Sequence, residues 1–188
     1  SKNRSCGASF APVRVLLARR RSLCRISGVL VSGTTIAAAT KAIPASVAET
    51  VDDVQVVATD SFWNGAGFDL DRLRTDVVDV LLAGEAATYD EWDWHAQVLR
   101  SGRTVEPTGV VIVEGVCALH RMFRDDMAVR IWVDAPYEVR LERGVARDGE
   151  AARSTWVDVW MPNEAAYVER DDPVACAHLV VDGTAPYA

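Results

Sequence analysis

The sequence predicts an α/β protein, a three-layer sandwich in which helices cover both faces of a mainly parallel five-stranded sheet. Short apolar runs alternate with segments of helical periodicity, which is typical of βα units. The run GVVIVE at 109–114 is apolar on both faces, as a central parallel strand must be. At 188 residues, the chain is long enough for one such domain.

The individual elements follow from these patterns. Strands are expected at 23–26, 54–59, 109–114, 129–133 and 178–181. Helices are expected at 34–43, 70–82, 117–124 and 137–147, and in part of 148–175. The apolar run at 13–17 is an alternative first strand, but we favour 23–26 because it leads directly to Gly28. The polar, tryptophan-containing segment 86–108 shows no clear period and is expected to leave the core.

Composition is that of an ordinary globular protein, with 49% apolar and 25% charged residues and a mean hydropathy of +0.05. No apolar run approaches the roughly 18 residues needed to cross a bilayer, so a membrane role is not expected. The cysteines form no C-x-x-C pair and the histidines have no zinc-ligand spacing. We therefore expect a cytoplasmic protein without a structural metal. The oligomeric state stays open, a homo-oligomer included.

Charge is distributed unevenly along the chain. Residues 1–48 carry eight basic and no acidic side chains, and the remainder carries 27 acidic against 12 basic ones. The acid-free segment 1–48, which includes the basic segment 1–22, is compatible with a transit peptide, with a nucleic-acid-binding arm around Arg19–Arg21, or with a shifted coding frame. The third explanation fits best, because an out-of-frame GC-rich gene yields sequence rich in Arg, Ala and Ser. The acidic remainder argues against a nucleic-acid partner.

The stretch 28–35 has the spacing of a phosphate-binding P-loop, G-x-x-x-x-G-K-[ST]. Thr35 supplies the hydroxyl expected to bind Mg²⁺, but Thr34 stands where the motif has lysine, so a fixed positive charge is missing. The apolar residues at 29–31 also resist wrapping around a phosphate. The predicted nucleotide-binding residues are Gly28, Ser32, Gly33, Thr34 and Thr35.

Two acidic residues follow predicted strands of the sheet. Asp60 comes after 54–59, and Glu114 ends 109–114. Ligands bind outside the carboxyl ends of parallel strands, so both carboxylates are expected beside the phosphate loop. Phosphoryl transfer assisted by Mg²⁺ needs one carboxylate to accept a proton and one to hold the metal. Alone, each residue would more simply end a strand; together with the loop they favour function.

Several short motifs occur in the order found in the uridine kinase-like branch of P-loop kinases, and the chain resembles that family over about 23–184. They are Asp60-Ser61-Phe62-Trp63, Phe68-Asp69, Tyr89, Trp92-Asp93-Trp94, Glu114-Gly115 and the arginines Arg140, Arg143 and Arg147. The resemblance implies a single P-loop kinase-like domain at 23–188, with a substrate excursion at about 61–108 and a small helical lid at about 144–165. It also implies ATP and Mg²⁺ as cofactors and a nucleoside as substrate.

The resemblance further implies a role for each motif. Asp60 would be the base towards the nucleoside 5′-hydroxyl, and Glu114 would join Thr35 at Mg²⁺. Asp69 would hold the ribose hydroxyls, and the three arginines would lead into the lid. The aromatic substrate residues would be Phe62, Trp63, Tyr89 and Trp92. Asp93, which lies between Trp92 and Trp94, would also contact the substrate.

The altered loop leaves two hypotheses open. The first is an ATP-dependent kinase of a pyrimidine nucleoside, acting by in-line transfer to a hydroxyl activated by Asp60 and impaired by the missing lysine. The alternative is a catalytically inactive module that keeps the fold and a nucleoside or nucleotide pocket. Position 34 distinguishes the two.

Overall fold

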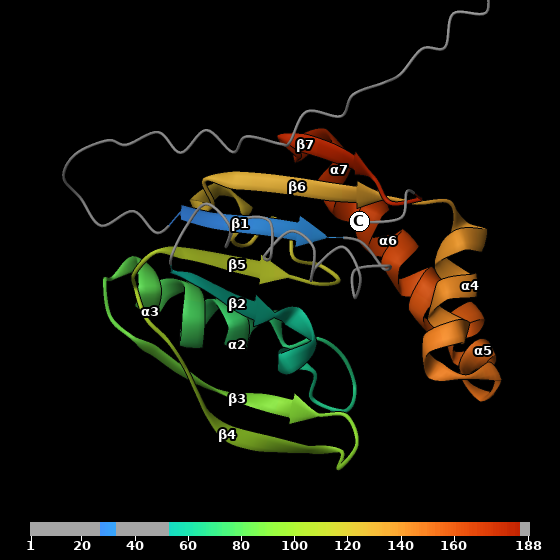
Figure 1. Ribbon diagram of the computed structural model, residues 1–188, viewed down its shortest axis with the longest axis horizontal. Coiled ribbons are helices and arrows are strands. Elements are labelled where there is room, and N and C mark those ends of the chain that lie inside the picture. Colours follow the sequence, from blue (N-terminus) through green and yellow to red (C-terminus); the bar gives the residue numbers. More distant parts are fainter. Residues whose placement is uncertain (1–26, 33–52, 185–188) are drawn as a thin grey trace, which may run out of the picture.

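The computed structural model describes residues 27–32 by their backbone and residues 53–184 in full (Figure 1). The expected strand 23–26, the expected helix 34–43, the basic segment 1–22 and the loop residues Gly33, Thr34 and Thr35 lie outside this part. No helix in the described ranges is long and apolar enough to span a membrane.

The five-stranded parallel sheet is confirmed. Its strands are β1 Ser27–Ser32, β2 Val54–Ala58, β5 Val110–Glu114, β6 Val129–Asp134 and β7 Leu179–Asp182. They lie in the order β2-β5-β1-β6-β7, and every neighbouring pair is parallel. The chain passes from β1 over β5 to the edge strand β2, returns to β5 and then crosses β1 to β6. The strand order therefore reverses at β1, where α/β sheets of this kind bind ligands.

The position of the first strand corrects one expectation. Gly28 was expected to open the phosphate loop, but it lies inside β1, paired with Val111 of β5. The apolar residues at 29–31 belong to the same strand and pair with β5 on one side and β6 on the other. Apolar and β-branched residues suit a central strand better than a tight loop. Gly28 therefore lies in a strand and does not open a loop.

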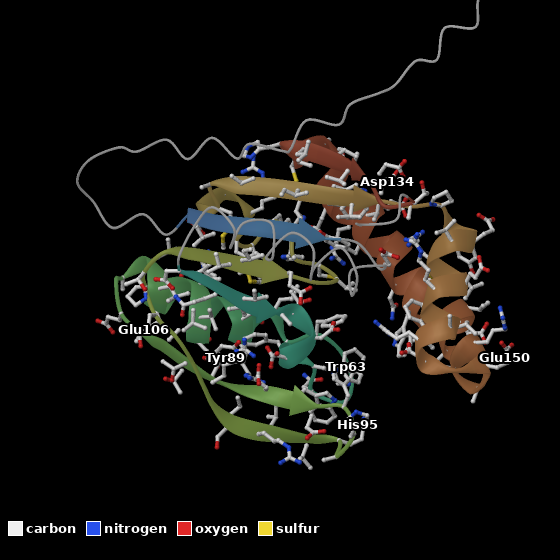
Figure 2. The ribbon with its side chains drawn as sticks, in the orientation of Figure 1. Trp63, Tyr89, His95, Glu106, Asp134 and Glu150 are labelled. Carbon is white, nitrogen blue, oxygen red and sulfur yellow. The ribbon has the colours of Figure 1, made fainter. Side chains whose placement is uncertain are left out.

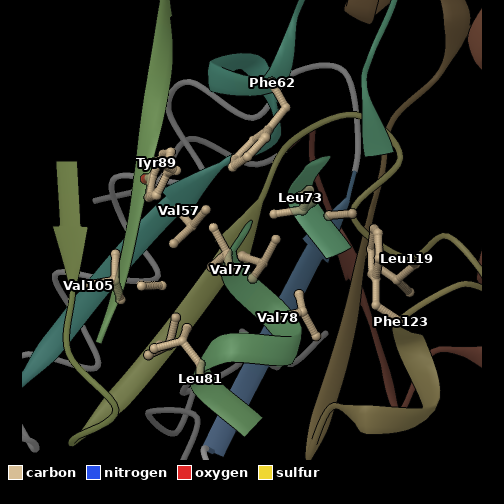
Figure 3. Close-up of a cluster of buried hydrophobic side chains, with 14 residues drawn as sticks. Val57, Phe62, Leu73, Val77, Val78, Leu81, Tyr89, Val105, Leu119 and Phe123 are labelled. Atoms are coloured by element: carbon tan, nitrogen blue, oxygen red, sulfur yellow. The ribbon is translucent and has the colours of Figure 1, made fainter. Parts of the chain in front are cut away.

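One face of the sheet packs against a helical segment in the core (Figure 3). The predicted helix 70–82 is confirmed as the consecutive turns α2 Leu70–Arg72, η2 Leu73–Val78 and α3 Asp79–Leu82. Val57, Val111 and Val113 of the sheet share this core with Leu73 and Val77. Alternate residues of a strand point to opposite faces, so Val110 and Ile112 join Ile131 and Val133 in a second cluster.

The segment 86–108 is a β-hairpin and not an irregular excursion. Strand β3 Ala87–Asp93 pairs antiparallel with β4 Val98–Val105 below the sheet edge in Figure 1. Strand β4 shows no period-2 pattern, because seven of its eight residues are exposed and it has no buried face.

The expected helix 117–124 is also wrong. The chain after β5 forms turns that end in the short η3 Arg124–Asp126. Gly115 (φ +123°) and Cys117 (φ +65°) adopt left-handed conformations, which interrupt an α-helix at its start.

The last third of the chain is mostly helical. The predicted helix 137–147 is confirmed as α4 Tyr137–Asp148. The elements η4 Glu150–Ala152, α5 Arg153–Thr155, η5 Trp156–Trp160, α6 Met161–Asp171 and α7 Pro173–Cys176 follow. In Figure 1, α4 and α5 lie beyond the arrowheads of β1 and β6, at the carboxyl edge of the sheet. The segment proposed as a lid therefore stands at the edge where ligands bind.

Candidate active site

Strand register brings the two predicted carboxylates to one edge of the sheet. Glu114 is the last residue of β5 and is paired with Val31 of β1 and Ala58 of β2. Asp60 lies two residues beyond Ala58, in the 3₁₀ turn η1 Thr59–Phe62. The carboxyl end of β1 therefore lies next to Glu114, and Asp60 follows from the strand on its other side.

The Asp60 carboxyl is electrostatically perturbed. Part of Asp60 is exposed to solvent. Surrounding protein atoms nevertheless desolvate its carboxyl group, and this raises the pKa of the carboxyl. The positive charge of Arg147 opposes the rise in this pKa and the negative charge of Asp148 adds to it. A carboxyl with a raised pKa is a better proton acceptor than an ordinary aspartate.

The three arginines of α4 are each held by a different partner. Arg140 pairs with the buried Glu164 of α6, and Arg143 donates to the carbonyl oxygens of Gly183 and Thr184 after β7. Arg147 donates to its neighbour Asp148. The three arginines, which were expected on one face of the helix, therefore do not share a partner. The electrostatic influence on Asp60 is that of Arg147.

A polar network attaches the hairpin to the end of β2. The Ser61 hydroxyl donates to Glu91 Oε1 at 3.3 Å, and Arg103 Nη1 donates to the same oxygen at 3.1 Å. Arg103 Nη2 also donates to the carbonyl oxygen of Val56 at 3.0 Å. Glu91 and Arg103 are not evident from the sequence, because the network joins residues 12 to 47 positions apart and leaves no local pattern.

The predicted aromatic substrate residues separate into two groups. Phe62 and Tyr89 are buried in the core, with stacked rings 5.0 Å apart. Trp63 is half-buried and packs on Phe68 and Trp94, with ring centroids 5.3 and 5.4 Å away. Figure 2 shows Tyr89 between sheet and hairpin, and Trp63 and His95 towards the hairpin tip. Only the second group presents aromatic surface to solvent.

Trp92 belongs to this second group. Its ring lies 6.5 Å from that of Trp94, edge to face, and close to the loop at Gly65. Among the described residues, neither its buried indole N–H nor the buried hydroxyl of Tyr89 has a hydrogen-bond partner. Burial raises the pKa of that Tyr89 hydroxyl to about 12. The region between η1 and the hairpin therefore holds two polar atoms without partners.

Both predicted substrate aspartates have structural contacts. Asp69 caps α2 by accepting the Arg72 N–H at 3.0 Å. Asp93 accepts backbone N–H groups of the hairpin turn and pairs with Arg100, and the turn N–H groups and Arg100 lower the pKa of its carboxyl. The roles in substrate binding expected of these two residues stay predictions.

No family model matches the chain. It is 32% identical to a uridine kinase of Halobacterium salinarum over 93 residues, which are 48% of this chain and 41% of that protein. It is 38% identical to a uridine kinase of Staphylococcus aureus over 86 residues, 43% and 40% of the two chains. The chain thus spans less than half the length of these relatives.

A solved structure described as a possible uridine kinase from Bacillus stearothermophilus superposes with a TM-score of 0.61 at 16% identity, over 87% of this chain and 91% of that one. Part of the chain is thus similar in sequence to uridine kinases, and its fold is similar to that of a possible uridine kinase. D-glycerate 3-kinase from Cryptococcus neoformans superposes with a TM-score of 0.51 at 14% identity, over 84% and 80% of the two chains. The chain therefore shares its fold with both of these proteins.

Proposed function

We propose that the chain transfers a phosphoryl group from ATP to a hydroxyl of a small molecule, most simply a pyrimidine nucleoside. The observation that carries the proposal is Asp60, a desolvated carboxylate beside the end of β5 and within electrostatic reach of Arg147. This pairs a proton acceptor with a positive charge at the ligand-binding edge of a parallel sheet. The similarity to the uridine kinases of Halobacterium and Staphylococcus supports the nucleoside as acceptor.

Each charged group would have a distinct task in the transfer. Asp60 would accept the proton of the attacking hydroxyl, and Arg147 would neutralise charge on the transferred group. Glu114 ends its strand at the same edge, and a carboxylate with a threonine hydroxyl is a donor set suited to Mg²⁺. We therefore assign the metal to Glu114 and Thr35. Mg²⁺, when bound, would screen the phosphate charges.

The nucleoside would lie between η1 and the hairpin. Trp63 and Trp94 offer aromatic surface for a base. Trp92 adds an indole N–H without a partner, which can donate to a base carbonyl. Phe62 and Tyr89 would support this surface from the core and would not touch the base in this conformation.

A second candidate function is a binding module without catalysis. It is favoured by the length of β1, which runs to Ser32 and takes Gly28 out of the loop. The P-loop frame of four residues between two glycines is thus not available as a loop, and Thr34 supplies no positive charge. Such a module would keep the nucleoside surface and bind ATP weakly.

Thermal shift and product formation separate the two functions. The unmodified chain would be titrated with uridine, cytidine and ATP, with and without Mg²⁺, and assayed for nucleoside monophosphate. Kinase function predicts product that is lost in Asp60→Asn, and more product in Thr34→Lys because the lysine charge is restored. Stabilisation by nucleoside alone, with no product from either the unmodified chain or Thr34→Lys, would instead support the binding module.

A further inference from the structure

We propose that Trp156 is a positioning residue, which acts through Asp148 to hold the Arg147 guanidinium at the Asp60 side of the site. Its role in catalysis rests on the proposed kinase function. The placement of Arg147 does not rest on that function, because it can be measured without turnover.

A chain of hydrogen bonds connects the three side chains. The Trp156 indole N–H donates to Asp148 Oδ2 at 3.0 Å. Arg147 donates to both oxygens of the same carboxylate, from Nε at 2.7 Å and from Nη2 at 2.9 Å. A two-point contact fixes the plane of a guanidinium as well as its position. The orientation of Arg147 is therefore set by Asp148, and that of Asp148 by Trp156.

The Trp156 ring also contacts Arg147 directly. The guanidinium carbon lies over the ring, 5.6 Å from its centroid, in a cation–π arrangement. The Arg147 side chain is otherwise half exposed, at 51% of its free area. A long exposed side chain samples many rotamers. The bonds to Asp148 and the contact with the Trp156 ring restrict Arg147 to one of them.

Trp156 can restrict Arg147 because it is itself fixed. Its residue is only 3% exposed, and it packs beside Val145 and Met161 between α4 and α6. The ring lies so close to Gly144 that a Cβ there would be 2.5 Å from its atoms. Trp160 packs edge-on against it at 4.9 Å. The indole is thus held on three sides and presents its N–H to Asp148.

The consequence reaches Asp60 through charge. Arg147 lowers the pKa of Asp60 and Asp148 raises it, with Arg147 the larger of the two influences. Asp148 and Arg147 lie next to each other at the end of α4, so moving the pair moves both charges. If Trp156 releases them, Asp60 loses the net positive influence. Its carboxyl would then hold its proton more tightly and the transferring group would lose a cation.

The test compares matched tryptophan variants of the full chain. Trp156→Phe keeps an aromatic ring beside Gly144 and removes the N–H that Asp148 accepts. Trp160→Phe makes the same chemical change one helical turn away, on a ring that packs edge to face against Trp156. Arg147→Gln removes the charge itself and sets the full size of the effect. The carboxyl ¹³C resonance of Asp60, assigned with Asp60→Asn, is titrated in each.

We expect the Asp60 titration to move to higher pH in Arg147→Gln, by a smaller step in Trp156→Phe, and not at all in Trp160→Phe. In an active preparation, Trp156→Phe should lower kcat roughly 10- to 100-fold with an unchanged nucleoside KM, as expected for a misplaced charge. The proposal is overturned if Trp156→Phe titrates like the unmodified chain, or if Arg147→Gln does so. Absence of turnover in every variant would count against the kinase function alone, since the titration still decides the placement.

Discussion

Gly115 packs directly against Thr59, so that a β-carbon at position 115 would overlap the threonine hydroxyl and lie 3.2 Å from its Cβ. Gly115 follows Glu114 and Thr59 precedes Asp60, so this contact brings together the two strand ends that carry the carboxylates. Only glycine fits, because φ of +123° disfavours any side chain as well. The distance between the proposed base and the proposed metal ligand thus depends on a residue that has no side chain.

Gly115→Ala should destabilise the fold by about 2 kcal/mol or more, through backbone strain and overpacking against Thr59. Gly67→Ala is the matched control, because a β-carbon there meets nothing within 4 Å. Urea unfolding of both variants measures the difference. Equal midpoints would contradict the close packing of the two strand ends.

Asp60→Asn should abolish phosphoryl transfer and raise stability at pH 7. The pKa of Asp60 is raised above its ordinary value of 3.8, so the folded state binds the proton more tightly than the unfolded state does. Any stability associated with that proton is present below pH 3.8 and is lost as pH rises through the folded pKa.

The gain in Asp60→Asn should therefore shrink as pH falls from 7 towards 3.8, which thermal unfolding at several pH values would show. The proposed phosphoryl transfer should rise with pH through the same folded pKa in the unmodified chain, since the base must be ionised. A stability gain in Asp60→Asn that does not depend on pH would show that the carboxyl is not desolvated.

Tyr89→Phe should stabilise the fold by roughly 1 kcal/mol, because it removes a buried hydroxyl that has no partner. The folded pKa of about 12 lies above the ordinary 10.0, so the unmodified protein should lose stability from pH 10 upward as the unfolded chain ionises. The advantage of Tyr89→Phe should grow over that range. The exposed Tyr137 provides the control variant Tyr137→Phe, which should be nearly neutral by calorimetry.

Trp94→Ala should weaken nucleoside binding by about 1–3 kcal/mol, the usual contribution of one aromatic side chain to base stacking. Its stability should change little, because Trp94 is 39% exposed. Leu82→Ala removes a side chain of similar exposure, 40%, from α3 and should leave affinity unchanged. Calorimetric titration with uridine measures the affinity of both variants. Equal affinity would show that Trp94 does not contact the base.

The charge boundary near residue 48 leads to a prediction at the level of the gene. If the coding frame is shifted over 1–48, another frame of the same DNA should encode G-x-x-x-x-G-K-[ST] ahead of a helical pattern. Reading both alternative frames checks this directly. The hypothesis is wrong if neither contains the motif, and the lysine-free loop is then the native one.

Periodicity was sufficient for the elements with a clear buried face. The strand 109–114 and the helices 70–82 and 137–147 were predicted within about one residue of β5, α2–α3 and α4. It failed for the hairpin, whose outer strand β4 has almost no buried side. The glycine spacing of the P-loop motif also placed 28–32 in a loop, where the structure has the strand β1.

The sequence by itself determined the alternation of strands and helices, and with it the edge of the sheet at which Asp60 and Glu114 would lie. It also showed the missing lysine, since a motif is read from residue order alone. Only the tertiary structure decided that Gly28 belongs to a strand, that Phe62 and Tyr89 are core residues, and that Trp156 reaches Asp148. These facts depend on contacts between residues far apart in the chain or on strand pairing, and such contacts leave no local pattern in the sequence.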